Sequence, residues 1–371
     1  MTVTYASSGV DIQLGDDASK VLYEAAKLTW ENRKGRLGEV FAPFDDFTGL
    51  RVINVGGLPK KTVMCLGFDG VGTKMELGER IQKHDTVAFD LLAMVCDDAV
   101  VRGGEPVLVG SILDVRSLKD KDGKPYLDFV RQLGRGYVAA AKAARVAIIN
   151  GEVAELGARV SGYGDFNYNW GAGCVWFARK DRMLTGKQIK PGQHIVALRE
   201  HGFRSNGLSL VRKILKTVGN EEWHAGALGR YFAENVLAPS IIYSAAVVDM
   251  TGGVYGTPQA RVTGVSHITG GGIPGKLGRT LKLAGLGAVL DNLFEPPPIM
   301  QSVKAIGGVA DEEAYKTWNM GNGMLIITTT PEKVIGVAQQ HGIEARIAGY
   351  VTEMPEIEIK THTGKVLRYA A

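Results

Sequence analysis

Residues 61–74 read KTVMCLGFDGVGTK and join an apolar run to a segment rich in glycine. The run over residues 61–66 predicts a short strand, and the glycines that follow it predict that the strand ends in a tight turn. The turn contains Gly67, Asp69, Gly70, Gly72, Thr73 and Lys74. It therefore places a carboxylate, a hydroxyl and an ammonium group on one short loop.

Such a turn is a candidate phosphate site. Glycines let backbone N–H groups approach phosphate oxygens, and Lys74 would supply a compensating charge. The spacing fits neither GxxxxGK[ST] nor GxGxxG. Two interpretations stay open: a phosphate-binding turn, or a tight hairpin turn with a solvated Lys74.

Strands alternate with helices on both sides of this stretch. In the first half the pattern predicts helices over residues 18–34, 86–102 and 126–145, and strands over residues 107–113, 146–149 and 173–178. Asp16 or Asp17 is the expected cap of the first helix, and Gly35 its end. This alternation is typical of α/β folds.

A polar segment over residues 179–193 contains Gly186, Pro191 and Gly192 and predicts a domain boundary. We expect two α/β domains, 1–180 and 181–371. The second should contain strands over 194–198, 262–268, 323–328, 345–351 and 356–360, helices over 206–218 and 240–250, and a helix opened by Pro331.

Composition limits the kinds of partner. The 371 residues include 43 Lys and Arg against 39 Asp and Glu, a formal net charge of +4, and the basic residues are dispersed. So weak a charge argues against a nucleic-acid or membrane-surface partner. Glycine is the exception: 49 residues are about twice the usual share. This excess predicts many sharp turns, or many loops that approach a ligand closely.

The cysteines and the termini indicate the compartment. Cys65, Cys96 and Cys174 show no CxxC spacing and lie in apolar stretches, so we expect buried thiols, a reducing compartment and no structural zinc site. Residues 1–10 lack a signal-peptide pattern, and no apolar run approaches the ~18–20 residues of a membrane span. These features predict a cytoplasmic protein.

Two adjacent acids lie in the helix predicted over residues 86–102. Helical spacing puts Asp98 on the apolar stripe with Leu91 and Val95, and Asp97 on the neighbouring stripe. A buried carboxylate needs a partner. Mg²⁺, which takes one or two carboxylates plus substrate phosphates, would supply one, with Asp69 as a further ligand. The alternative is an aspartate satisfied by backbone amides or by an arginine.

Another acid follows a predicted strand. Glu152, in the segment Asn150-Gly151-Glu152, comes directly after the strand over residues 146–149. Ligands of α/β sheets bind beyond the carboxyl ends of the strands. Glu152 is therefore a candidate metal ligand or base, whereas Glu155 is expected to be solvated or to cap.

Two loops in the second half are candidate anion sites. In the first, Arg204, Ser205, Asn206 and Gly207 open a helix, whose free N–H groups attract anions. An ordinary helix cap would explain Ser205 or Asn206 alone.

The second anion loop contains His267, Thr269, Gly270, Gly271 and Gly272 and precedes a helix expected to start at Pro274. Three successive glycines cost folding entropy, which points to something that must come very close. A histidine such as His267 taken alone is more often a structural residue with satisfied hydrogen bonds. Together the two loops and the carboxylates indicate a phosphorylated small-molecule substrate and a metal nucleotide.

These motifs, taken in order, resemble the phosphoribosylformylglycinamidine cyclo-ligase (aminoimidazole ribonucleotide synthetase) family. The resemblance begins at Tyr5 and Gly9 to Ile12 and covers most of the chain. It continues through residues 69–74, 84–86, Asp98, 105–106, 151–155, 205–213, 237–243, 269–272 and 321–324.

The resemblance implies two α/β domains, the N-terminal one with a mixed sheet that pairs across a homodimer to close a β-barrel. It implies a ligase of purine biosynthesis that uses ATP and Mg²⁺ to close the imidazole ring of formylglycinamidine ribonucleotide. The products would be aminoimidazole ribonucleotide, ADP and phosphate.

The resemblance also assigns residues. Mg²⁺ would be held by Asp69, Asp98 and Glu152, and the nucleotide by these three with Gly70, Gly72, Thr73 and Lys74. Substrate or transferred phosphate would lie at Arg204, Ser205, Asn206 and Gly207 and at Thr269, Gly270, Gly271 and Gly272. His267, Lys74 and Asp69 would be the catalytic residues.

Three positions and two segments depart from the family pattern, and one of the segments is residues 150–157. Phe68 stands in place of Thr, Asp97 in place of Asn and Arg204 in place of His, and residues 39–46 replace a glycine-rich segment that helps to hold the nucleotide. Two alternatives therefore stay open. One is a related enzyme that uses ATP on a different small substrate, as thiamine-monophosphate kinase does, and the other is a non-catalytic nucleotide-binding paralogue.

Overall fold

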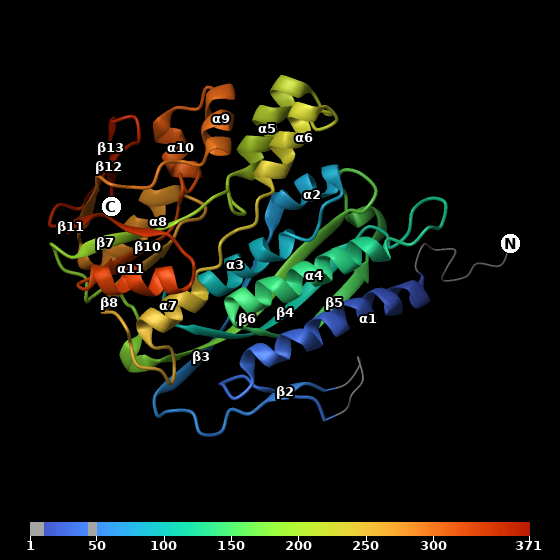
Figure 1. Ribbon diagram of the computed structural model, residues 1–371, viewed down its shortest axis with the longest axis horizontal. Helices are drawn as coiled ribbons and strands as arrows, with labels where there is room; N and C mark the ends of the chain where they lie inside the picture. The colour runs from blue at the N-terminus through green and yellow to red at the C-terminus, as the bar shows by residue number, and fades with distance from the viewer. Residues whose placement is uncertain (1–10, 44–49) are drawn as a thin grey trace. The chain divides into compact units, whose positions relative to one another are not determined.

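The computed structural model describes residues 11–43 and 50–371, and the chain divides into two compact units (Figure 1). The first unit comprises Met1–Leu58, Cys65–Cys96 and Pro106–Trp176, and the second comprises Pro59–Met64, Asp97–Glu105 and Phe177–Ala371. Each unit comprises three separate segments of the sequence, whereas the prediction has one boundary between residues 180 and 181. That boundary stays a prediction.

The first unit is built on a four-stranded sheet with the order β3-β6-β4-β5. The strands are β3 (Thr62–Gly70), β4 (Glu105–Val115), β5 (Ala147–Glu155) and β6 (Tyr168–Arg179). The two neighbours β4 and β5 run parallel, with Leu108 opposite Ala147 and a register shift between Val109 and Gly110. A separate pair, β1 (Val40–Phe41) and β2 (Val52–Ile53), is antiparallel.

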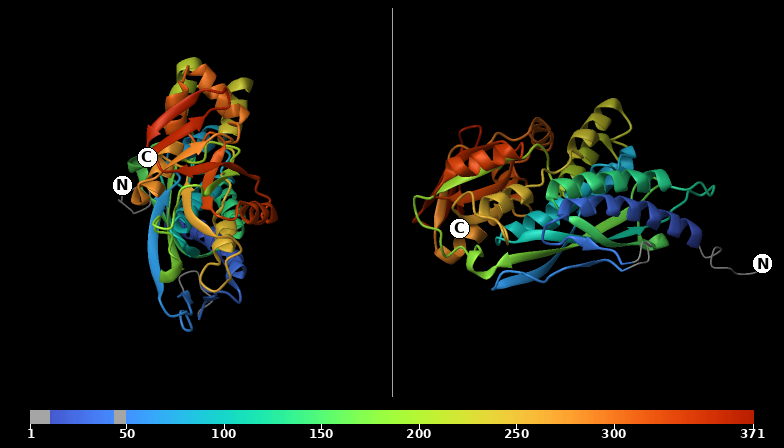
Figure 2. Two further views of the ribbon diagram at one scale, coloured as in Figure 1. Left: turned by 90° about the vertical axis from the view of Figure 1, so that its left-hand side faces the viewer. Right: turned by 60° about the horizontal axis from the view of Figure 1, so that its bottom comes forward.

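Helices cover one face of this sheet. Figure 2 shows α1 (Ile12–Thr29) and α4 (Leu127–Ala144) side by side on that face. The unit also contains α2 (Met75–Ile81) and most of α3 (Val87–Val100). The end of α1 is tied to β5, because the Ile148 N–H donates to Thr29 Oγ1 at 2.8 Å and Trp30 Nε1 donates to Ile148 O at 2.8 Å.

The predicted cap of the first helix is wrong. Asp11 caps α1, since its Oδ1 accepts from the Leu14 N–H at 3.2 Å, and Asp16 and Asp17 lie inside the helix. The helix starts earlier than predicted because Leu14 is buried one turn before Ala18, on the same face of the helix. A short 3-10 turn, Trp30–Arg33, then leads to Gly35, whose φ is +66°.

The predicted ends of two strands are also wrong. β3 continues through Gly70 because its ladder with β6 reaches the hydrogen bond from Val71 N–H to Trp170 O, at 3.1 Å. β5 continues to Glu155, which pairs with Val115 of β4. Asp69 and Glu152 therefore lie within strands, and the glycine turn begins only at the 3-10 segment Gly72–Lys74.

The second unit is built on a seven-stranded mixed sheet with the order β13-β12-β9-β11-β7-β10-β8. All neighbours for which the pairing is defined are antiparallel except β12 and β9, which are parallel. The strands are β7 (His194–Arg199), β8 (Val262–His267), β9 (Gly287–Leu290), β10 (Asn322–Thr328), β11 (Ala345–Thr352), β12 (Glu356–Lys360) and β13 (Val366–Ala370).

Both faces of the middle of this sheet are covered. Every residue of β10 is buried. On one face Val265 joins a core with α7 (Ser244–Thr251) and α11 (Pro331–Gln340). The next residue, Ser266, points to the other face and bonds Thr280 of α8 (Gly272–Leu281) at 2.7 Å. The remaining helices are α5 (Leu208–Gly219), α6 (Ala227–Val236), α9 (Pro298–Ile306) and α10 (Asp311–Thr317).

The predicted strands and helices of both halves exist, and the start of α11 at Pro331 is confirmed. Sequence patterning missed α2, α6, α9, α10, β9 and β13. Cys96 and Cys174 are buried as predicted, but Cys65 is exposed because β3 lies at the edge of its sheet. Within residues 11–43 and 50–371, no helix is both long and apolar enough to cross a membrane.

A close contact requires glycine at one position of α4. A Cβ built on Gly136 would lie 2.0 Å from the carbonyl oxygen of Asp85, whereas nothing lies within 4 Å of a Cβ built on Gly15 of α1. We expect Gly136→Ala to lower the free energy of unfolding by about 1–3 kcal/mol because the backbone must move apart. Urea denaturation of the full chain measures the change.

Gly15→Ala is the matched control and should raise the free energy of unfolding by about 0.5–1 kcal/mol, because alanine favours helix. Equal effects of the two substitutions would contradict the close packing of α4 on residue 85.

Candidate functional site

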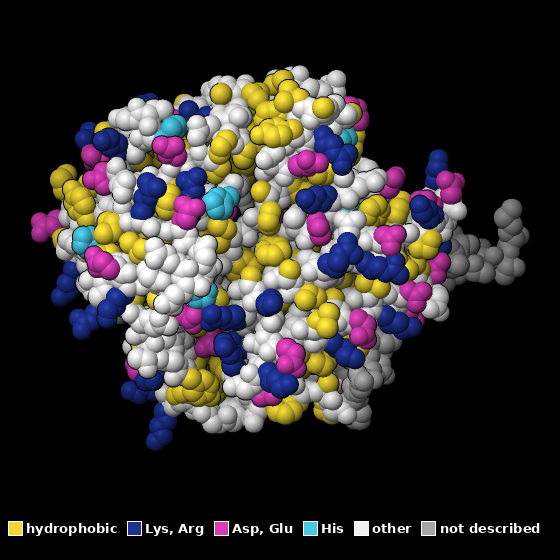
Figure 3. All heavy atoms as spheres, in the orientation of Figure 1, with side chains coloured by type: hydrophobic (Ala, Val, Ile, Leu, Met, Phe, Trp, Pro, Cys, Tyr) yellow, Lys and Arg dark blue, Asp and Glu magenta, His cyan; other side chains and the backbone are white. Residues whose placement is uncertain are grey.

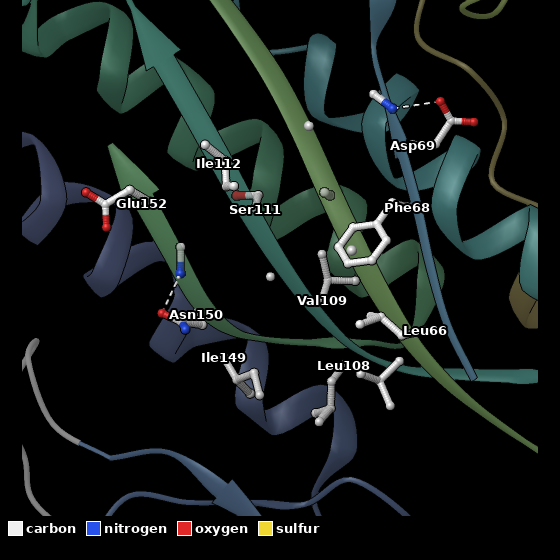
Figure 4. A pocket seen from close by; sticks show the side chains of 17 residues that line it. Leu66, Phe68, Asp69, Leu108, Val109, Ser111, Ile112, Ile149, Asn150 and Glu152 are labelled. Carbon is white, nitrogen blue, oxygen red and sulfur yellow. Dashed lines mark hydrogen bonds between the residues drawn. The ribbon is translucent and has the colours of Figure 1, made fainter. Parts of the chain in front are cut away.

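The face of the four-stranded sheet opposite α1 and α4 carries an open cavity of about 810 Å³ (Figure 4). Strand alternation places Leu66 and Phe68 of β3 on this face, and Phe68 is 76% exposed. The ring of Phe68 lies over Gly173 of β6, where a Cβ would be 2.8 Å from Cε1. Ile112 of β4 extends the apolar surface and is 56% exposed.

Polar groups line the same cavity. Figure 4 shows Asn150 and Glu152 at one side, and Asp69 at the other. Asp69 Oδ1 accepts from the Gly70 N–H at 2.7 Å, and Asn150 Oδ1 accepts from the Gly151 N–H at 2.9 Å. An apolar hollow with a few polar groups is typical of a surface that binds a ligand or a partner.

Asp69 and Glu152 are not close together. They lie on β3 and β5, the two outer strands of the sheet, so three strand spacings, about 14 Å, separate them. Mg²⁺ holds its oxygen ligands at about 2.1 Å, so the two carboxylates of one chain do not reach one ion. Among the described side chains, no group of three or more His, Cys, Asp or Glu could hold a metal ion.

The turn after β3 separates its polar residues. Gly72 and Thr73 are exposed, with a φ of +69° at Gly72. Lys74 is instead fully buried, and its Nζ lies 2.7 Å from Asp90 Oδ1 of α3, itself fully buried. The predicted ammonium group is therefore paired inside the unit and does not line the cavity.

In the second unit, Arg204 lies at the centre of a buried cluster. The residue is 1% exposed and has a φ of +59°. Its Nη1 donates to Glu200 Oε2 and to Ile241 O, each at 2.7 Å, and its Nη2 donates to Asp97 Oδ2 at 2.9 Å. The expectation that Arg204 faces an anion pocket is wrong, because these carboxylates already neutralise it.

The expectation for the acid pair in α3 is also corrected. Asp97 is the buried acid, and Asp98 is 55% exposed at its side chain. Asp97 Oδ1 accepts from the N–H groups of Tyr243 and Ser244, at 2.9 and 2.8 Å, where α7 begins. Burial raises the pKa of Asp97 to about 7, against the opposing effect of Arg204 and these two N–H groups. The alternative of an aspartate held by backbone amides and an arginine is therefore confirmed, for Asp97.

His267 connects the cluster to Asp98. Its Nε2 lies 2.8 Å from Arg204 Nη2, and its Nδ1 lies 2.7 Å from Asp98 Oδ1. A guanidinium only donates, so Nε2 accepts and Nδ1 carries the proton. Burial lowers the pKa of His267 to about 4, so the ring is neutral near pH 7.

Asp98 is held as a carboxylate. Burial acts to raise its pKa, but the hydrogen bond from His267 and the positive charges of Lys276 and Arg204 prevail and hold the pKa below its usual value. Asp98 is the solvent-facing end of the cluster.

The two predicted anion loops lie beside each other. A Cβ on Gly270 would be 3.7 Å from Asn206 Nδ2. Among the described residues, Ser205 Oγ and Asn206 Oδ1 are buried without a hydrogen-bond partner. Helix α8 begins at Gly272 rather than at Pro274, directly after the second loop.

Backbone conformation and packing, rather than a ligand, explain why two of the three successive glycines are needed. Gly271 and Gly272 have φ of +93° and +59°, and a Cβ on Gly272 would lie 2.0 Å from Tyr315 O. Gly270 has neither a positive φ nor such a contact, because a Cβ there meets nothing nearer than Asn206 Nδ2, at 3.7 Å. Thr269, also predicted, is 5% exposed, and its carbonyl accepts from the Gly272 N–H at 2.9 Å.

Sequence reasoning missed Glu200 and Tyr243. Glu200 is fully buried, and Tyr243 Oη donates to Arg199 O at 2.6 Å and lies 3.2 Å from Glu200 Oε2. The available signal was the spacing of Glu200 and Arg204, four residues apart, directly after the strand over residues 194–199.

We expect Arg204→Met to lower the free energy of unfolding by about 3–5 kcal/mol, because it leaves Asp97 and Glu200 buried without their cation. Arg230→Met, which removes an exposed pair with Glu234 in α6, should cost less than about 1 kcal/mol. Urea denaturation at neutral pH compares the two. A cost below about 1 kcal/mol for both variants would argue against the buried ion cluster.

The chain thus has two α/β units, one with an apolar sheet face that carries a few polar groups, and the other with paired glycine and hydroxyl loops. The model of the family "AIR synthase related protein, N-terminal domain" matches residues 51–175, and that of "AIR synthase related protein, C-terminal domain" matches residues 190–362. The chain belongs to the AIR synthase related family, and the predicted two-domain α/β fold is confirmed.

Similar proteins agree with this membership. A phosphoribosylformylglycinamidine cyclo-ligase from Methanococcus maripaludis is 34% identical over 372 residues, covering 98% of this chain and 97% of that protein. One from Sorangium cellulosum is 33% identical over 362 residues, covering 96% and 97%. The resemblance found in the sequence is therefore confirmed.

A solved structure has a similar fold. The hydrogenase maturation protein HypE in complex with ATP superposes with a TM-score of 0.56 at 14% identity, covering 86% of this chain and 88% of that one.

Proposed function

We propose that the chain is an ATP- and Mg²⁺-dependent cyclo-ligase of purine biosynthesis. It would close the imidazole ring of formylglycinamidine ribonucleotide to give aminoimidazole ribonucleotide, ADP and phosphate. The observation that carries this proposal is the 34% identity to a phosphoribosylformylglycinamidine cyclo-ligase over 98% of the chain. ATP would activate the formyl oxygen, and the amidine nitrogen would then attack the formyl carbon.

The loops of the second unit support phosphate binding. Ser205 Oγ is buried and, among the described atoms, lacks a partner, and Asn206 lies beside Gly270. The positive end of the α8 dipole, which begins at Gly272, also attracts anions. We assign Ser205, Asn206, Gly207 and the segment Thr269–Gly272 to substrate phosphate or to the transferred phosphoryl group.

Carboxylates of both units suit Mg²⁺, which prefers oxygen ligands and usually takes only one or two from protein. We assign Asp69, Asp98 and Glu152 to this role, with Asp69 and Glu152 of one chain at different ions because they lie too far apart to share one. Gly70, Gly72 and Thr73 would contact the nucleotide. Lys74 would do so only after leaving Asp90.

The open sheet face supports a homodimer. β3 is an edge strand of nine residues without Lys or Pro, and Met64, Leu66 and Phe68 on it are exposed. Such an edge favours pairing with another strand. We infer that two copies of the chain cover this face.

The other partner assignments rest on charge and thiol chemistry. Figure 3 shows Lys and Arg interspersed with Asp and Glu on the face in view, which does not favour a nucleic-acid partner. The free thiols Cys65, Cys96 and Cys174 favour the cytoplasm, where thiols stay reduced.

Turnover tests the proposed function. Purified protein with MgATP should release ADP and phosphate only when formylglycinamidine ribonucleotide is present, as measured by a coupled ADP assay and by chromatography of the product.

Asp98→Asn should weaken MgATP binding about tenfold in calorimetry, because it removes a charged oxygen ligand. It should keep the fold, because the two side chains are nearly isosteric.

Asp128→Asn is the matched control, since Asp128 is exposed on α4 and only pairs with Arg131. It should bind MgATP like the wild type. Protein that binds MgATP but never turns over with this substrate would refute the cyclo-ligase assignment.

The dimer has its own test. Phe68→Lys should convert the dimer to a monomer in sedimentation velocity, because it places a charge in the covered apolar face. Leu228→Lys, at a side chain 70% exposed on α6, should leave the dimer intact. A dimer that survives Phe68→Lys would place the interface elsewhere.

A further inference from the structure

The ring of His267 has no free nitrogen. Nε2 faces Arg204 Nη2 at 2.8 Å, and Nδ1 faces Asp98 Oδ1 at 2.7 Å. The His267 side chain is 2% exposed. An acid or base must reach the proton that it transfers, and here both nitrogens are occupied by protein groups. The position assigned to a catalytic histidine is thus held by a residue that only connects two others.

Arg204 and Asp98 together fix which nitrogen of His267 carries the proton. The guanidinium has hydrogens to donate and no lone pair, so Nε2, which faces it, is unprotonated, and the Asp98 carboxylate only accepts, so Nδ1 carries the proton. Arg204 itself is fixed by Glu200, by Asp97 and by the carbonyl of Ile241. The hydrogen bonds therefore run in one direction: Arg204 donates to His267, and His267 donates to Asp98.

The members of this hydrogen-bonded cluster differ sharply in how much of each side chain is exposed. Asp97 is 0% exposed and Arg204 1%, whereas the Asp98 side chain is 55% exposed. Only Asp98 presents its charge to solvent.

We propose that Arg204 is a positioning residue that acts through His267 to hold the Asp98 carboxylate in one orientation toward the metal nucleotide. This inference rests on the proposed function only in naming the nucleotide as what Asp98 meets. His267 is then a positioning residue as well, and Asp98 is the group of the cluster that touches the ligand.

The first test needs no ligand. Two-bond ¹H–¹⁵N NMR spectra of the histidine side chains distinguish the two neutral tautomers. We expect His267 of the wild type to carry its proton on Nδ1. Arg204→Lys keeps a cation between Asp97 and Glu200 but loses the planar fork, so part of the His267 population should move to the Nε2–H form. A wild-type ring protonated on Nε2 overturns the inference, whatever the protein binds.

The second test uses MgATP affinity, measured by calorimetry. Arg204→Lys should weaken binding about tenfold in the wild-type background and leave it unchanged in the Asp98→Asn background, because residues that act in series are not additive. Equal effects in both backgrounds would show a general structural role and overturn the proposal. Thermal melts of each variant check the fold.

Two substitutions of His267 separate its two nitrogens. His267→Asn places an amide donor near the position of Nδ1, whereas His267→Gln places one near Nε2 and leaves Asp98 without its donor. We expect about threefold weaker MgATP binding for the first and about tenfold for the second. The reverse order would contradict the inference. Wild-type protein that binds no MgATP would refute the proposed function alone, since the change of tautomer in Arg204→Lys still tests the role of Arg204.

Discussion

The candidate site of the second unit depends on one buried cation. The guanidinium of Arg204 joins the end of β7, through Glu200, to the end of α3, through Asp97, and to the end of β8, through His267. Taking a cation out of water is strongly unfavourable unless carboxylates and carbonyls replace the lost hydration. Four elements that are distant in sequence are thereby fixed at one point, since Asp97 also caps α7.

Much of the fold could be predicted from local pattern. The apolar run of β10 and the helical spacing of α4 gave the right elements because burial decides both. The ends of β3 and β5 could not be predicted, because glycine and asparagine at residues 70 and 150 read as turns locally. Pairing with β6 and β4 keeps them extended. Tertiary hydrogen bonds override local preference there.

The site was predicted in its residue types and less well in its geometry. The sequence predicts that Asp98, His267 and the glycine loops lie near a ligand, which stays a prediction, but it does not show which of two adjacent acids is buried. Helical spacing favoured Asp98, whereas the N–H groups of residues 243 and 244 and the guanidinium of Arg204 select Asp97. The local sequence predicts that Lys74 is a phosphate ligand, because it does not show that Lys74 pairs with Asp90, sixteen residues later.

The cluster makes residues 97 and 204 unequal in what their loss would do. Arg204 contacts both Asp97 and Glu200, so removing the arginine leaves two buried carboxylates without a cation. Removing the Asp97 carboxylate leaves Arg204 still paired with Glu200. The acid is therefore the member of the pair that the fold can lose at the smaller cost in stability.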